Sequence, residues 1–151
     1  MNLQYEDIFS VFLTKITDYS FLEYDNDYVR EQMVSWLHAS SSYPRLVAKF
    51  STLSMQDEVA MLDFTLKNPI NDELDAEFVK NILAHSMVIS WLEPQVKNVL
   101  LTKQMLGGKE EKFYAQANHL SQLQQMLSEA KFELAKILRD YGYLNNSYIK
   151  E

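Results

Sequence analysis

The sequence predicts an all-α protein of four to five helices that ends in a long C-terminal helix. Only three glycines and three prolines occur among 151 residues. That is too few for an all-β chain, which needs a turn about every 8–12 residues. Apolar side chains also recur every three or four residues in several segments, which is typical of one face of a helix. Around residues 55–66 this spacing fails, and the prediction there allows a short irregular or β excursion.

Two helices are expected in the first third of the chain. The first covers about residues 5–17, because six apolar side chains there share one helical face. A polar and aromatic connector over residues 18–27 leads to a second helix that ends near Ser40. Pro44 ends that helix, since proline disfavours the helical conformation in the residue before it. A short third helix is expected over residues 45–50.

A fourth helix is expected to begin after Pro69. Asn71 or Asp72 can cap it, and acidic residues fill its first turn, where the helix dipole favours negative charge. Pro94 lies inside the helical pattern, so the sequence predicts a kink or a break near Leu92, with further helix to Leu106.

The last helix is the strongest prediction, over about residues 117–141. Gly107 and Gly108 precede it as a stop signal and a candidate hinge, and Gly142 follows it where a C′ glycine belongs. Its apolar seam repeats at alternating spacings of three and four, as in coiled coils. The seam consists of Leu120, Leu123, Leu127, Ala130, Leu134, Ile137 and Tyr141.

Two interpretations of this seam stay open from the sequence. It is either the core face of a globular helix or a surface that packs against another subunit. The second interpretation makes candidate interface residues of most of the seam and of two tyrosines beyond it. They are Leu120, Leu123, Leu127, Leu134, Ile137, Tyr141, Tyr143 and Tyr148. We expect one helical domain over residues 1–142 and a polar tail over 143–151 that is flexible until it docks.

Charge is negative and unevenly distributed. Residues 1–77 hold 14 acidic and 5 basic side chains, a net −9, and residues 78–151 hold 7 and 9, a net +2, which together give −7. This balance disfavours generic binding of duplex DNA, which needs a basic face. The apolar run over residues 82–92 is too short to span a bilayer, so no membrane association is expected. The polar N-terminus does not read as a secretory signal.

No motif in the chain predicts an active site. There is no cysteine, and the three histidines (His38, His85 and His119) lack the spacing of a metal site. Gly107-Gly108-Lys109 is followed by Glu110 and so departs from the phosphate-binding loop pattern. The sequence therefore predicts a protein without enzymatic activity, bound metal or cofactor.

Four segments resemble a family of small virion proteins from tailed phages and prophages of Gram-positive bacteria. They are residues 5–19 (YEDIFSVFLTKITDY), 91–94 (WLEP), 106–120 (LGGKEEKFYAQANHL) and 139–146 (RDYGYLNN). These segments are spread over most of the chain, and the resemblance is weakest over residues 40–70.

The resemblance implies a head-to-tail connector, also called a neck or adaptor protein. Such proteins are non-enzymatic and α-helical, and they form a ring beneath the portal through which DNA passes without specific binding. The expected partners are the portal and other neck or tail proteins, and the expected location is the virion, assembled in the host cytoplasm. In such adaptors an extended C-terminal segment often binds the portal, which here is the last helix and residues 143–151. Two alternatives remain: a tail or baseplate component, and a small acidic regulatory protein that binds a protein partner.

Overall fold

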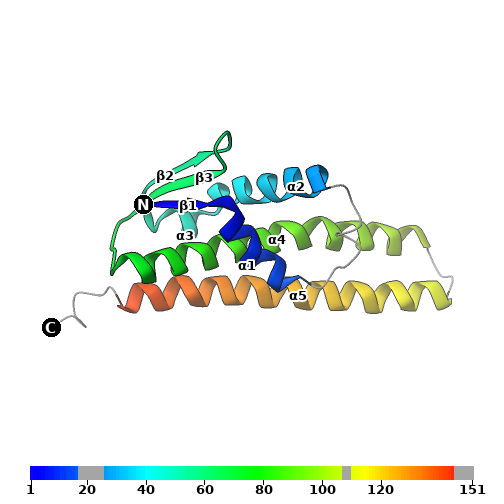
Figure 1. Cartoon of the computed structure of the whole chain (residues 1–151). Helices are drawn as coiled ribbons and strands as arrows, with labels where there is room; N and C mark the ends of the chain where they lie inside the picture. The colour runs from blue at the N-terminus through cyan, green and yellow to red at the C-terminus, as the bar shows by residue number, and fades with distance from the viewer. Residues whose placement is uncertain (17–25, 107–109, 145–151) are drawn as a thin grey trace.

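The computed structural model describes residues 1–16, 26–106 and 110–144 (Figure 1). Helices α4 and α5 lie side by side as a long helical hairpin, and the smaller elements lie on α4 (Figure 1). The elements in chain order are β1 (Asn2–Gln4), α1 (Tyr5–Lys15), α2 (Asn26–Ala39), the 3₁₀ turn η2 (Ser40–Ser42), α3 (Pro44–Val47), β2 (Phe50–Gln56), β3 (Met61–Leu66), α4 (Asp72–Leu106) and α5 (Glu110–Leu144).

The prediction of an all-α fold is wrong, because three strands form an antiparallel sheet of order β1-β3-β2. The chain is a mixed α/β fold in which helices predominate. In the central strand, Leu62, Phe64 and Leu66 are buried, whereas Asp63 and Thr65 between them are exposed. This alternation is the period of a half-buried strand, so residues 61–66 do carry a strand signal.

Helices α1 and α2 pack over α4. Helix α1 begins directly after β1 and buries Tyr5, Ile8, Phe9 and Phe12, which is most of the stripe that predicted it. Phe12 also contacts Trp36 of α2, with ring centroids 5.6 Å apart. The two helices and the sheet thereby share one core with α4.

Helix α4 has 35 residues and runs through Pro94, so a break near Leu92 is wrong, while the alternative of a kink there stays a prediction. At about 1.5 Å per residue, a helix of this length is roughly 52 Å long. The predicted cap is confirmed, because the backbone N–H of Leu74 donates to Oδ1 of Asn71 at 2.8 Å. Beside Pro94, the side-chain amide of Gln95 donates to the carbonyl oxygen of Trp91 at 3.0 Å.

Helix α5 also has 35 residues and is longer at both ends than predicted. It begins at Glu110 rather than near Ala117, and it continues past Tyr141 to Leu144. The prediction of Gly142 as a C′ residue is therefore wrong, since this glycine lies within the helix. Packing along α4 supplies the stability that an isolated helix would lack, and it outweighs the cost of one glycine.

Candidate functional site

The α5 seam faces α4 within the same chain. Leu120, Leu123, Leu134 and Tyr141 are buried, and Leu127 and Ile137 are half-buried against the core. The core-face interpretation therefore describes how these six side chains pack in the single chain. Contact of the same residues with another subunit stays a prediction. The candidate hinge Gly107 and Gly108, the side chain of Tyr143, and Tyr148 lie outside the described residues.

Tyr141 joins the end of α5 to the beginning of α4. Its ring stacks on Phe78, with centroids 3.7 Å apart and planes 11° from parallel. Its hydroxyl donates to Oδ1 of Asp75 at 2.6 Å and lies 3.2 Å from the carbonyl oxygen of Asn68. Asp75 is only 4% exposed, and the same oxygen accepts the backbone N–H of Ile70 at 3.0 Å. This end of the helical hairpin is consequently held by both apolar and polar contacts.

An open apolar groove lies beside this junction, and we call it the α4–α5 groove. Its volume is about 300 Å³, and Leu74 and Ile70 in its wall are 50% and 37% exposed. The acidic side chains of Glu77 and Asp140 stand at its edge. The lining residues are Ile70, Leu74, Glu77, Phe78, Ile137, Asp140 and Tyr141. Exposed apolar side chains that gather in this way mark surfaces for protein contact more often than isolated ones do.

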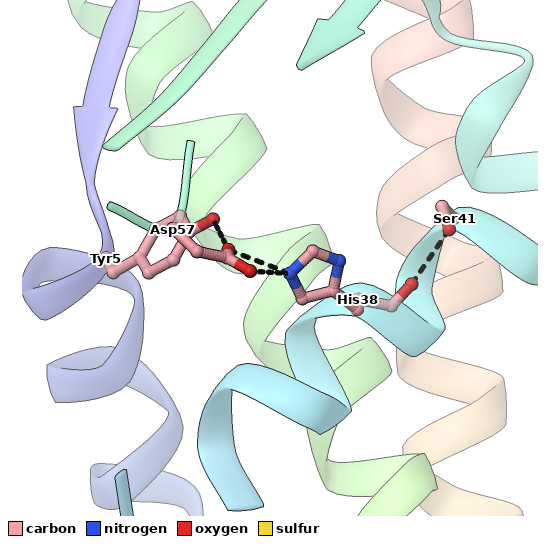
Figure 2. A network of polar contacts seen from close by, with 4 residues as sticks. All are labelled: Tyr5, His38, Ser41 and Asp57. Atoms are coloured by element: carbon pink, nitrogen blue, oxygen red, sulfur yellow. Dashed lines mark hydrogen bonds and ion pairs between the residues drawn. The ribbon is translucent and has the colours of Figure 1, made fainter. Parts of the chain in front are cut away.

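A second feature is a polar cluster that joins three separate elements (Figure 2). Asp57 stands at the turn between β2 and β3, between Tyr5 of α1 and His38 at the end of α2. The hydroxyl of Tyr5 donates to Oδ1 of Asp57 at 2.5 Å, and Nε2 of His38 lies 2.8 and 2.9 Å from the two carboxylate oxygens. The hydroxyl of Ser41 donates to the carbonyl oxygen of His38 at 2.8 Å.

Electrostatics indicate that this cluster is a structural clamp, a set of hydrogen bonds that holds the elements together, rather than a reactive site. Burial, together with the hydrogen bond and the charge of Asp57, raises the pKa of Tyr5 far above its ordinary value. The hydrogen bonds from Tyr5 and His38 lower the pKa of Asp57. A His–Asp pair can orient a general base, but the hydroxyl within reach here is a buried phenol that already donates to the carboxylate. The cluster therefore fixes the β2–β3 hairpin to α1 and α2.

His85 lies beside a small hollow of about 190 Å³ between α1, α4 and α5. Burial, with the charge of Lys15 as a smaller cause, lowers the pKa of His85 to about 4, and the charge of Glu133 opposes this shift. A neutral imidazole can bind a metal, but within the described part of the chain no three His, Cys, Asp or Glu side chains are grouped to hold one. The hollow therefore suggests no specific ligand.

Signals for the α4–α5 groove and the polar cluster were weak in the sequence. Leu74 precedes Phe78 and Ile82 at spacings of four, so the sequence pattern alone places it on the buried face of α4, whereas in the structure it is 50% exposed. Asp57 and His38 are 19 residues apart and meet only because the β2–β3 hairpin folds over the end of α2. Their pairing has no spacing rule that a single sequence could reveal.

Comparison of the chain with known protein families, with curated proteins and with solved structures found no match. Within the described residues, no helix combines the length and the apolar character needed to cross a membrane.

Proposed function

We propose that this chain is a non-enzymatic structural protein of a phage virion, a head-to-tail connector that docks on the portal. The resemblance of four sequence segments to such proteins supports the proposal. The α4–α5 groove is the structural observation that carries it, because this groove lies at the end of α5, the segment that the family uses to contact the portal.

The groove suits a docking role because its supports are rigid. Phe78 and Tyr141 form its stacked floor, and the bond from Tyr141 to the buried Asp75 holds the two helices together there. A preformed groove costs little conformational entropy when a partner binds. Leu74, half-exposed in the free chain, would then be covered by an apolar side chain of the portal, with Glu77 and Asp140 facing basic residues.

Exposed negative charge supports a position next to DNA. On the described residues up to position 77, ten carboxylates are exposed, against five basic side chains in the same part of the chain. The exposed acidic residues are Glu6, Asp7, Asp27, Glu31, Asp57, Glu58, Asp63, Asp72, Glu73 and Glu77. In a ring, those of these carboxylates that face the channel would repel the phosphate backbone and let DNA slide.

Binding to the portal tests the proposal. The full-length chain is added to the purified portal protein of the same phage, and complex formation is measured by sedimentation. Leu74→Glu should abolish binding, because it places a charge in the apolar contact. The matched control is Phe132→Glu, since Phe132 is 63% exposed on α5 and does not line the groove. Equal binding by wild type and Leu74→Glu would refute this docking surface, and no binding by the wild type would refute the portal as partner.

A further inference from the structure

A basic groove lies on the surface of this acidic chain. It has a volume of about 310 Å³ and lies between α3 and the last third of α5. Arg45, Lys49 and Arg139 line it, together with a floor of Ala48, Ala135 and Leu138. Arg139 is paired with its neighbour Asp140 at 3.6 Å, and Arg45 and Lys49 form no ion pair with any other described residue. Three cations around a small apolar floor fit a carboxylate carried next to an apolar side chain.

The tip of the β2–β3 hairpin carries this combination. Glu58 is exposed, and the neighbouring Val59 is 60% exposed, which is unusual for a branched apolar side chain. In Figure 1 the hairpin projects away from the helices. The tip thus presents one carboxylate and one apolar side chain side by side at the end of a projection.

The tip is also held in one conformation. Asp57 is clamped by Tyr5 and His38, and the carbonyl oxygen of Ala60 accepts the backbone N–H of Tyr5 at 2.9 Å. Ala60 has a φ of +54°, a left-handed conformation that a non-glycine residue keeps only when its surroundings enforce it. These bonds pre-order residues 57–60, so little entropy is lost if the tip inserts into a partner.

The tip and the basic groove cannot meet within one chain. Lys49 in the groove directly precedes β2, and the tip directly follows it. A seven-residue strand separates them by roughly 20 Å. Two complementary surfaces at opposite ends of a strand allow a head-to-tail contact, in which the tip of one copy meets the groove of the next. Such contacts close into a ring when the rotation between copies allows it.

We propose that the hairpin tip of one copy inserts into the basic groove of the next copy. Glu58 pairs with the cations of the groove, and Val59 packs on its apolar floor. A nucleic acid is the less suitable occupant, because a chain of net charge −7 repels a phosphate backbone while a single protein carboxylate needs only a local cluster of cations. This contact rests on the proposed function, because the ring in which the copies meet is the ring of the connector proposal.

Sedimentation velocity of the full-length chain tests the charge pairing. The wild type should associate with rising concentration, and added salt should weaken the association. Glu58→Arg and Arg139→Glu should each weaken it by roughly tenfold or more. The double variant should associate more strongly than Glu58→Arg alone, because one pair of opposite charges is formed again while Arg45 and Lys49 still repel the new cation. Glu31→Arg, an exposed charge reversal on α2, should leave association nearly unchanged. Circular dichroism establishes that each variant is folded.

Because the chain has no cysteine, disulfide trapping tests the geometry even if the contact is weak. Val59→Cys combined with Ala135→Cys places one thiol on the tip and one in the groove, and mild oxidation should give linked multimers. Val59→Cys with Gln122→Cys, an exposed α5 position outside the groove, should not. Equal trapping by the two pairs, or none by the first, would overturn the proposal. So would binding of a duplex DNA probe that Arg139→Glu abolishes while the first pair fails to cross-link.

The two proposals can fail separately. Association and trapping use only the purified chain, whereas portal binding and presence in particles test the connector function. If the contact forms but the chain does not bind the portal, the head-to-tail contact stands and the connector function is wrong.

Discussion

Replacing Tyr141 by phenylalanine isolates one hydroxyl at the end of the helical hairpin. The ring remains able to stack on Phe78, so the apolar contact is retained. What is lost is the 2.6 Å hydrogen bond to Asp75, a carboxylate that is only 4% exposed. Water cannot readily replace the missing donor at such a site.

The size of the effect follows from this burial. A hydrogen bond to a charged group contributes about 1.5–3 kcal/mol, so Tyr141→Phe should lower the free energy of unfolding by about that amount. For a domain of this size each kcal/mol corresponds to about 2–4 °C in Tm. A loss of roughly 3–12 °C is therefore expected.

Urea unfolding followed by circular dichroism measures this loss, and Tyr5→Phe is the matched control. Tyr5 also donates to a carboxylate, but the Asp57 side chain is 52% exposed, so water can hydrate it after the change. The control should lose no more than about 0.5–1.5 kcal/mol. An equal or larger loss in Tyr5→Phe would show that burial of Asp75 does not control the strength of the Tyr141 bond.

Three further predictions concern the core, the pH dependence and the clamp. Leu134→Ala, at a fully buried seam position, should lower the free energy of unfolding in urea by about 2–5 kcal/mol. Phe132→Ala on the same helix should change it by less than about 0.5 kcal/mol. Similar losses in the two variants would contradict the burial assignment. Because the pKa of His85 is lowered to about 4 from 6.5, the unfolded chain binds a proton there first. The free energy of unfolding should therefore fall as pH decreases from 6.5 toward 4, and His85→Gln should flatten that part of the plot of stability against pH. An unchanged plot would assign the slope to other groups. Asp57→Ala removes the bonds to Tyr5 and His38 together, so amide hydrogen exchange should accelerate in β2 and β3 but not in the α4–α5 interface; uniform acceleration would show that the clamp supports the whole fold.

The positions of α1, α2 and the central part of α5 were predictable from the sequence because each of these helices buries a stripe of apolar side chains at helical spacing. The stripe of α1 and the α5 seam both face the core, and the Asn71 cap is where its side-chain chemistry placed it. Helix α4 does not break at Pro94 because it packs along α5, and that packing outweighs one lost backbone hydrogen bond. Gly142 misled the prediction in the same way at the end of α5.

The sequence indicated only part of the sheet, because the short strand β1 pairs with β3 over a long distance in the chain. β1 has three residues and joins β3 some 60 positions away, as in the pair Leu3 and Leu62. β2 alternates between exposed and less exposed side chains over residues 52–56, but an irregularity between Phe50 and Thr52 interrupts its first part. The tertiary core specifies the pairing of β1 with β3, and the three residues of β1 are too few to show a strand period.

The two grooves proposed as contact surfaces could not be predicted from the sequence either. The α4–α5 groove and the basic groove each combine residues more than 60 positions apart, such as Leu74 with Ile137 and Arg45 with Arg139. Periodicity identified the face of α5 that is buried within the chain, and the fold determines which exposed residues come together. A surface that binds a partner depends on how several helices and strands pack together. The apolar stripe of a single helix does not indicate it.

Quantitative mass spectrometry of purified virions tests the central claim most directly. Under the connector proposal, a phage or prophage carries this coding sequence, and the chain is measured in its virions relative to the portal protein. The connector proposal predicts that the chain is present at a low, fixed ratio to the portal in every preparation. Its absence from particles that contain the portal and are infectious would contradict the proposal.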